Sequence, residues 1–335
     1  MTIKRAAVIG GGVIGAGWVA RLIENGIDVA VFDPAPDAGQ KLQAVLDNAE
    51  RAYGRLLPKR LAKGKVARAA SVGRAVTGTE WIVEAVPERL DLKRQVYAEV
   101  EAAADPAAII ASSTSGILPS ELQANLAHPG RLIVGHPFNP VYLLPLVEIV
   151  AGRQTSPATV EAAGAFYASI GMKPLVVRKE IDAFIADRLL EAVWRESLWL
   201  VKDGICTTEE LDDAIRYGFG LRWAQMGLFE TYRIAGGEAG MRHFLAQFGP
   251  CLTWPWTKLT DVPEFNDELV DLIAGQSDAQ SGHLSIRELE RIRDDNLIAI
   301  MDALSRANDG LGWGAGAVLA DYRRRLARHA AQADG

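Results

Sequence analysis

Residues 5–33, RAAVIGGGVIGAGWVARLIENGIDVAVFD, contain the pattern that decides the fold. A short run of apolar and β-branched residues comes first, glycines follow, and WVARLIENG then places apolar residues at helical spacing. The stretch ends in a second apolar run, VAVFD, which closes at Asp33. This order predicts a strand, a tight turn, a helix and a second strand, as at the start of an α/β sheet.

Five further apolar runs predict more buried strands, and helix-compatible segments separate most of them. They are WIVEAV (81–86), AIIAS (108–112), RLIVGH (131–136), PLVEIV (145–150) and PLVV (174–177). Such alternation predicts a doubly wound sheet of the α/β class.

After about Arg178 the pattern becomes helical, with one long helix expected over 185–204, stopped by Gly204, and another over 288–307. We therefore expect an α/β domain over residues 1–180 and an all-α domain over residues 181–335.

The composition excludes several classes of protein. The chain has 335 residues, 49% of them hydrophobic, and its net charge of −6 offers no basic face, so we expect no nucleic acid partner. Two cysteines, Cys206 and Cys251, are too few for a disulfide framework and favour a reducing, cytoplasmic location. No stretch approaches the roughly 20 uninterrupted apolar residues of a membrane helix, so we expect no membrane span.

The glycine motif predicts a Rossmann-type dinucleotide site. Gly10, Gly12 and Gly15, with Val13 and Ile14 between the last two, match G-x-G-x-x-G between a strand and a helix. Gly10 permits the tight turn, Gly12 lets the backbone approach a pyrophosphate, and Gly15 lets the helix pack closely on the strand. The diphosphate is then expected at the helix N-terminus. The alternative is a glycine-rich turn that binds nothing.

Asp33 indicates which dinucleotide is bound. It lies 18 residues beyond Gly15, at the end of the second strand, where a carboxylate accepts hydrogen bonds from the adenosine ribose hydroxyls. A 2′-phosphate at this place would meet a like charge. We therefore expect NAD rather than NADP as the cofactor.

Three predicted strand ends carry polar side chains, and ligands of open α/β sheets bind beyond such ends. IIASSTSG ends one strand with Ser113 and Ser115 among its polar residues, LIVGHPFNP ends another with His136 and Asn139, and Glu148 lies within PLVEIV. These segments resemble the 3-hydroxyacyl-CoA dehydrogenase superfamily in order and in spacing, with 21 residues from Ser115 to His136 and 12 from His136 to Glu148. The resemblance extends from the glycine motif to the final helices.

The resemblance implies the roles of these residues. Oxidation of a secondary alcohol requires a base near neutral pH, and imidazole suits that task, so His136 is the expected base. Glu148 is expected to orient His136, Ser115 to hold the substrate oxygen, and Asn139 to orient substrate or nicotinamide. A core histidine with structural hydrogen bonds is the alternative for His136. The resemblance also implies cofactor contacts by Val86, Glu88, Lys93 and Ser113. Of these, Glu88 and Lys93 are expected on the nicotinamide side.

The substrate is predicted from departures from the acyl-CoA enzymes. Asp187 stands where those enzymes usually have asparagine, and Tyr142 and its neighbouring prolines look more like the carnitine dehydrogenases or the L-gulonate 3-dehydrogenase (lambda-crystallin) branch. The stretches GFGLRWAQMGLFET (218–231) and QFGPCLTWPWTKL (247–259) most resemble the carnitine dehydrogenases. This resemblance implies L-carnitine, a 3-hydroxyacid whose trimethylammonium group is bound best by aromatic faces and carboxylates.

We expect the substrate pocket to be lined by Phe138, Tyr142, Ala183, Ile185, Ala186, Asp187, Gly218, Phe219, Arg222 and Trp223. Arg222 is a candidate partner for the substrate carboxylate, although a structural salt bridge explains it equally well. One or two of the tryptophans of the helical part are expected in an aromatic cage, and the rest in the core or a dimer interface; they are Trp194, Trp199, Trp223, Trp254 and Trp256.

Two alternatives to a carnitine dehydrogenase stay open. One is an L-gulonate, 3-hydroxybutyrate or 3-hydroxyacyl-CoA dehydrogenase with the same mechanism; the other is a non-catalytic NAD-binding structural protein. No histidine has metal-ligand spacing, so we expect no metal site. The helix from about Ile185 carries apolar residues on more than one face, which predicts a homodimer through the helical domain.

Overall fold

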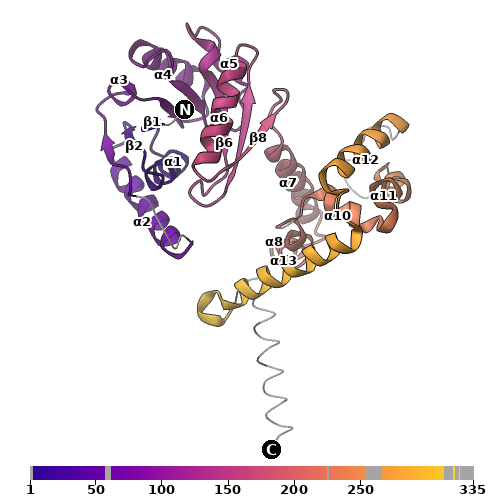
Figure 1. Ribbon diagram of the computed structural model, residues 1–335. Coiled ribbons are helices and arrows are strands. Elements are labelled where there is room, and N and C mark those ends of the chain that lie inside the picture. Colours follow the sequence, from indigo (N-terminus) through magenta and orange to yellow (C-terminus); the bar gives the residue numbers. More distant parts are fainter. Residues whose placement is uncertain are drawn as a thin grey trace, which may run out of the picture. The chain divides into compact units, whose positions relative to one another are not determined.

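The computed structural model describes residues 3–56, 62–224, 226–253 and 266–312, together with residues 320 and 324. The chain divides into two compact units, Met1–Leu190 and Glu191–Gly335, which are described one at a time (Figure 1). The boundary expected from the sequence, between residues 180 and 181, stays a prediction. Trp254 and Trp256 lie outside the described residues.

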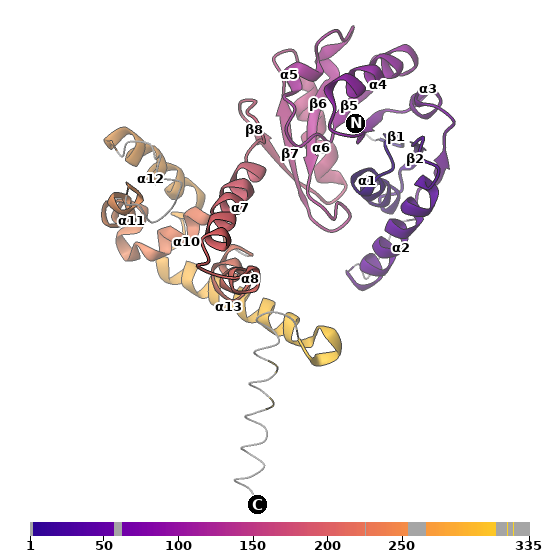
Figure 2. The same ribbon diagram turned by 180° about the vertical axis from the view of Figure 1, so that it is seen from behind.

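The first unit is built on one eight-stranded sheet with the order β3-β2-β1-β4-β5-β6-β7-β8 (Figures 1 and 2). Its strands are β1 (Arg5–Ile9), β2 (Asp28–Phe32), β3 (Val66–Arg68), β4 (Trp81–Glu84), β5 (Ile109–Ser112), β6 (Leu132–Pro137), β7 (Leu146–Ala151) and β8 (Lys173–Val177). All seven strands expected from apolar runs are present, which confirms the predicted doubly wound α/β sheet. Strand β3 was not predicted, because its three residues are exposed and form no apolar run.

The direction of the strands decides where functional loops gather. Strands β1 to β6 run parallel, β7 runs antiparallel to β6, and β8 is parallel to β7. The strand order reverses between β1 and β4, and the loops that follow these two strands therefore leave the sheet on either side of a crevice at its carboxyl edge.

Helices cover both faces of the sheet. One face packs against α1 (Val13–Glu24), α2 (Ala38–Leu56) and α6 (Pro157–Ser169), where Trp18, Trp81 and Tyr167 are among the largest buried side chains. The other packs against α3 (Val72–Val76), α4 (Leu90–Ala103) and α5 (Pro119–Leu122). The central strands β4, β5 and β6 are buried on both sides because helices cover both faces of the sheet.

The second unit is helical in its described part (Figure 1). Helix α7 (Ala186–Lys202) begins in the first unit and ends before Gly204, whose φ is +69°. It is followed by α8 (Thr208–Ala214), a π-helical turn (Ile215–Phe219), α9 (Gly220–Trp223), α10 (Leu228–Ala235), α11 (Gly240–Phe248), α12 (Asp267–Ser281) and α13 (Ile286–Arg306). The predicted helices over 185–204 and 288–307 thus correspond to α7 and α13, and the all-α class of this part is confirmed.

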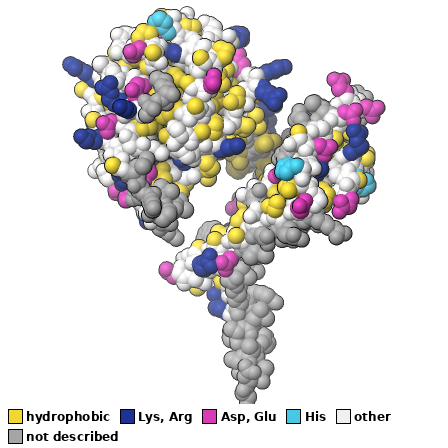
Figure 3. Space-filling model, in the orientation of Figure 1, with side chains coloured by type: hydrophobic (Ala, Val, Ile, Leu, Met, Phe, Trp, Pro, Cys, Tyr) yellow, Lys and Arg dark blue, Asp and Glu magenta, His cyan; other side chains and the backbone are white. Residues whose placement is uncertain are grey.

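The surface carries charges of both signs and one notable apolar face. Basic and acidic side chains lie among one another on the face shown in Figure 3. Helix α7 has no buried residue, and Leu189, Leu190 and Trp194 are 59%, 60% and 56% exposed. Among the described helices, none is both long and apolar enough to cross a membrane.

Candidate active site

The glycine turn after β1 is shaped by close backbone approaches. Gly10 has φ +98°, and a Cβ there would lie 2.4 Å from the carbonyl oxygen of Ala85 in the loop after β4. A Cβ on Gly15 would lie 1.8 Å from the Gly10 oxygen, so α1 can pack here only with glycine. A Cβ on Gly12 would meet nothing within 4 Å, and this open backbone at the start of α1 fits a dinucleotide pyrophosphate.

Asp33 lies directly beside this turn. One carboxylate oxygen accepts a hydrogen bond of 2.6 Å from the Gly11 N–H and the other accepts one of 2.8 Å from the Ala35 N–H. These two bonds fix the half-buried carboxylate at the end of β2, next to the turn. The position of Asp33 beside the glycine turn is consistent with the predicted contact to the ribose, which stays a prediction. Of the other predicted residues of the turn, Val13 is 62% exposed and Ile14 is half-buried.

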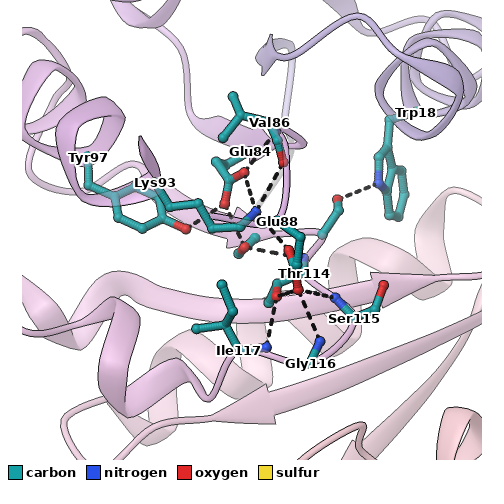
Figure 4. Close-up of polar contacts among 12 residues, drawn as sticks. Trp18, Glu84, Val86, Glu88, Lys93, Tyr97, Thr114, Ser115, Gly116 and Ile117 are labelled. Carbon is teal, nitrogen blue, oxygen red and sulfur yellow. Dashed lines mark hydrogen bonds and ion pairs between the residues drawn. The ribbon is translucent and has the colours of Figure 1, made fainter. Parts of the chain in front are cut away.

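A buried polar cluster lies beneath the loops that follow β4 and β5 (Figure 4). The carboxylate of Glu84, which is 1% exposed, accepts hydrogen bonds from Lys93 Nζ at 2.8 Å and from the Val86 N–H at 2.9 Å. Its second oxygen accepts bonds of 2.6 Å from Tyr97 and from Ser112. Burial and the neighbouring negative charge raise the pKa of Tyr97 well above its ordinary value, so the phenol stays a donor.

The cluster continues from Lys93 to the serine loop. Lys93 is 1% exposed and lies 3.3 Å from Glu88 Oε2 and 3.3 Å from the Val86 carbonyl oxygen. The other oxygen of Glu88 accepts bonds from the backbone N–H of Ser115 and of Gly116 at 3.1 and 3.2 Å and from the hydroxyl of Thr114. Glu88 and Lys93 therefore hold the loop that presents Ser115. Their contact with the nicotinamide stays a prediction.

The pKa of Glu88 reflects the same contacts. Burial raises it, but the hydrogen bond from Thr114, the charge of Lys93 and the N–H of Gly116 outweigh burial and hold the pKa below its ordinary value. The carboxylate is therefore charged at neutral pH.

Two further contacts tie the cofactor helix to the chemistry-bearing loops. Trp18 on α1 donates a hydrogen bond of 3.0 Å to the hydroxyl of Ser113, a predicted cofactor residue (Figure 4). Arg21, also on α1 and buried, donates bonds of 2.7 Å to the carbonyl oxygen of Val141 and 3.2 Å to that of Leu144. Neither residue was among the predicted site residues. Arg21 could have been recognised from the sequence, because it is a charged residue on the apolar face of the predicted helix.

His136 and Glu148 form a buried pair. They face each other across the antiparallel ladder of β6 and β7, and His136 Nδ1 lies 2.9 Å from Glu148 Oε2. The other oxygen of Glu148 accepts bonds of 2.9 and 3.0 Å from the backbone N–H groups of Ile185 and Ala186. Because Nδ1 is held by a carboxylate, the imidazole carries its proton there and Nε2 is the nitrogen that can accept one.

The environment of Glu148 keeps it charged. Its side chain is 0% exposed, and burial raises its pKa. The bonds from His136, Ala186 and Ile185 act in the opposite direction and outweigh burial, so the pKa lies below its ordinary value. Glu148 is therefore an anion that orients the imidazole.

The segment that leads into α7 and the first residue of that helix supply the backbone donors. Ala183 and Phe184 have φ values of +58° and +51°, a left-handed conformation that costs a side chain roughly 1–2 kcal/mol per residue. Phe184 is 0% exposed, and its ring lies 5.5 Å from that of His136, while the ring of Phe138 lies 5.1 Å away. The first turn of α7 then places Asp187 Oδ2 3.6 Å from His136 Nε2.

The other predicted positioning and substrate residues have the following surroundings. Ser115 and Asn139 are exposed, in the loops after β5 and β6. The ring of Tyr142 packs against Tyr53 of α2 at 6.4 Å. Gly218, Phe219, Arg222 and Trp223 belong to the second unit, where the rings of Phe219 and Trp223 are 4.6 Å apart and Arg222 is exposed. Within the described part of the chain, no group of three His, Cys, Asp or Glu residues could hold a metal ion.

Comparison with known protein families agrees with this geometry. The profile of the 3-hydroxyacyl-CoA dehydrogenase NAD binding domain matches residues 5–181, and that of the C-terminal domain of the same family matches residues 184–260. The chain belongs to the 3-hydroxyacyl-CoA dehydrogenase family. The predicted family is thereby confirmed, and NAD is the cofactor that its first domain binds.

Individual members of the 3-hydroxyacyl-CoA dehydrogenase family are similar over most of the chain. An L-carnitine dehydrogenase of Mesorhizobium japonicum is 67% identical over 332 residues, which cover 98% of this chain and 91% of that protein. The L-carnitine dehydrogenase/betainyl-CoA thioesterase of Rhizobium meliloti is 62% identical over 97% of this chain, but the chain spans only 66% of that longer relative.

A solved structure supports the same fold. The crystal structure of the NAD-dependent 5-formyl-3-hydroxy-2-methylpyridine 4-carboxylic acid 5-dehydrogenase has a TM-score of 0.72 at 28% sequence identity. The match covers 91% of this chain and 99% of that one.

Proposed function

We propose that this protein oxidises the 3-hydroxyl group of L-carnitine to the ketone, 3-dehydrocarnitine, with NAD as the acceptor and His136 as the general base. The observation that carries the proposal is the buried pair of His136 and Glu148, 2.9 Å apart, which leaves Nε2 as the reactive nitrogen. The names of relatives that are 67% and 62% identical to the chain over the aligned residues support the substrate.

The chain's own residues handle the proton. The substrate hydroxyl binds to His136 Nε2 and gives up its proton to that nitrogen as the bond between C3 and its hydrogen breaks. A nicotinamide dinucleotide held by the glycine turn and Asp33 would supply the acceptor for the hydride that leaves C3. The charge that then develops on the imidazole is stabilised by Glu148, which is fixed by its two backbone hydrogen bonds and need not move. The proton is finally released to solvent.

The serine loop and its neighbours position the substrate in this proposal. Ser115 holds the reacting oxygen, and its loop is fixed from below by Glu88. Asn139 orients substrate or nicotinamide. Phe138, beside the base, supplies an aromatic face to the trimethylammonium group.

The apolar face of α7 supports a homodimer. Leu189, Leu190 and Trp194 are each more than half exposed, and large apolar residues in this arrangement mark interaction surfaces. We therefore propose that two copies associate through this helix, and a monomer in size-exclusion chromatography with light scattering would contradict this. The two free cysteines support a reducing, cytoplasmic location, which fractionation of the source cells tests.

The substrate is tested by following NADH formation at 340 nm with the purified full chain and NAD. The panel is L-carnitine, D-carnitine, L-gulonate, L-3-hydroxybutyrate and a 3-hydroxyacyl-CoA. Turnover confined to L-carnitine supports the proposal. Turnover of gulonate or the acyl-CoA with none of carnitine would leave the mechanism intact and refute the substrate, and no turnover of any member would favour a non-catalytic NAD-binding protein.

A further inference from the structure

Asp187 occupies the reactive side of the catalytic histidine. Glu148 holds His136 at Nδ1, whereas Asp187 Oδ2 lies 3.6 Å from Nε2, the nitrogen to which the proposed function assigns the substrate hydroxyl. The Asp187 side chain is 23% exposed, so it is neither sealed in the core nor fully solvated. Two carboxylates therefore flank one imidazole, and only Asp187 adjoins the place where the substrate must bind.

The position of this carboxylate is fixed by the same contacts that fix the base. The N–H groups of Ile185 and Ala186 both donate to Glu148, which pins the start of α7 to the histidine pair. Asp187 is the next residue of the helix. Its location beside Nε2 therefore follows from the backbone and does not depend on a long, mobile side chain.

The covalent structure of carnitine brings its cation to this carboxylate. A hydroxyl that hydrogen-bonds to Nε2 lies about 3 Å from that nitrogen. The quaternary nitrogen is separated from this oxygen by two carbons, so the two atoms are only about 3–4 Å apart in any staggered conformation. A carboxylate 3.6 Å from Nε2 is thus within contact range of one arm of the substrate.

We propose that Asp187 selects the cationic arm of the substrate and turns its carboxylate arm away, an inference that rests on the proposed carnitine dehydrogenase activity. A trimethylammonium group donates no hydrogen bond. A polar side chain can therefore recognise it only through charge, as an anion in contact with its methyl groups. The other arm of carnitine ends in a carboxylate, which Asp187 repels. One side chain thus decides which arm lies on its side of the hydroxyl.

The same charge discriminates between enantiomers. When the hydroxyl lies on His136 and the hydrogen of C3 points to the nicotinamide, L- and D-carnitine exchange the places of their two arms. One enantiomer presents its ammonium arm to Asp187, and the other presents its carboxylate arm. Discrimination therefore follows from charge as well as from shape.

Asp187→Asn tests the inference because it keeps the shape of the side chain and removes its charge. Two substrates are compared: L-carnitine and the matching enantiomer of 3-hydroxy-5,5-dimethylhexanoate, in which carbon replaces the quaternary nitrogen. We expect kcat/KM for L-carnitine to fall roughly 10- to 100-fold, as for loss of a partly desolvated charge contact. The value for the neutral isostere should stay the same or rise.

Binding gives a readout that is independent of turnover. In the presence of NADH, 4-(trimethylammonio)butanoate, which lacks the hydroxyl, should bind the variant more weakly, while 5,5-dimethylhexanoate should not. The inhibition constant of D-carnitine should approach the KM of L-carnitine in the variant. Asp182→Asn is the matched control, because Asp182 is an exposed carboxylate in the same segment and its loss changes the net charge equally. Asp187→Ser is the second variant if the amide disturbs the start of α7.

The outcomes separate the two proposals. Equal losses of kcat/KM for L-carnitine and for the neutral isostere would overturn the inference alone, because a structural or proton-transferring role of Asp187 affects both substrates alike. Absence of carnitine turnover by the unmodified protein would refute the proposed function and the inference with it. A change in the ratio of the two kcat/KM values that Asp182→Asn does not reproduce establishes Asp187 as the selecting residue.

Discussion

Replacing Glu148 with glutamine should inactivate the proposed base while leaving the fold intact. Glu148 uses one oxygen for two backbone N–H groups, at 2.9 and 3.0 Å, and the other for His136 Nδ1. Glutamine has a single oxygen. If that oxygen turned to His136, the amide NH₂ would face two buried backbone donors, each unsatisfied at a cost of about 1–3 kcal/mol.

The amide is therefore expected to keep its oxygen on the backbone and to donate its N–H to His136 Nδ1. This forces the proton of the neutral imidazole onto Nε2, the nitrogen that must accept the substrate proton. Leaving both backbone donors unsatisfied would cost about 2–6 kcal/mol, which holds the amide in this orientation. The anion beside the developing imidazolium is lost as well. We expect kcat to fall by a factor of about 10³ to 10⁴, or roughly 4–5.5 kcal/mol of activation free energy.

The assay is NADH formation at 340 nm with saturating NAD and substrate. NADH affinity, followed by its fluorescence, should be unchanged because Glu148 contacts no part of the glycine turn. Glu80→Gln is the matched control: Glu80 also accepts two backbone hydrogen bonds, from Lys4 and Arg5, but it lies at the opposite edge of the sheet. A Glu148→Gln protein that melts normally and keeps more than a tenth of the original kcat would refute the assigned role.

Three further predictions follow from the same contacts. The Gly12→Ala protein should fold normally but bind NAD about tenfold more weakly or worse, because the new methyl group meets no protein atom and enters the space of the cofactor. The Gly15→Ala protein should be severely destabilised, because the new methyl group would lie 1.8 Å from a carbonyl oxygen. Thermal unfolding and NADH titration distinguish the two effects. Lys93→Met should cost about 3–5 kcal/mol of unfolding free energy, because it leaves the buried Glu84 carboxylate without its counter-charge. Glu84→Gln in the same chain should recover most of this loss in a urea titration, and no recovery would contradict the structural role of the ion pair. The pKa of Glu148 is lower in the folded protein than in the unfolded chain, so its ionisation stabilises the fold above about pH 4.3, the usual unfolded value, and this stability is lost as pH falls through the folded pKa. Glu148→Gln should therefore make the free energy of unfolding depend less steeply on pH in acid. An unchanged slope would show that ionisation of Glu148 is not coupled to folding.

Much of the fold could be predicted from local patterns. Apolar runs and the spacing of glycines indicated seven of the eight strands and the dinucleotide turn, since burial on both faces of a sheet requires continuous apolar residues. The exposed strand β3 was not predicted, because an edge strand needs no continuous apolar run. The spacing of His136 and Glu148 matched a family pattern, but no local rule indicated that the two residues pair across an antiparallel ladder.

The buried cluster around Glu84 shows the same division. A single acidic residue within the apolar stretch WIVEAV was a visible signal, yet nothing in the stretch identified its partners. Lys93, Tyr97 and Ser112 come from α4 and β5, and only the packing of that helix on the sheet brings them to one carboxylate. Lys93 is 1% exposed and engaged with Glu84 and Glu88, and its contact with the cofactor stays a prediction.

The sequence by itself determined the class of fold, the dinucleotide turn and the residue types available for chemistry, because these depend on periodicity and on the conformational freedom of glycine at fixed positions. Tertiary structure decided which nitrogen of His136 is held, which carboxylate holds it, and that Asp187 lies 3.6 Å from the other nitrogen. The physical reason is that strand register and the entry of α7 are set by contacts between residues far apart in the chain. A hydrogen bond or an ion pair depends on distances of a few tenths of an ångström, which only those contacts define.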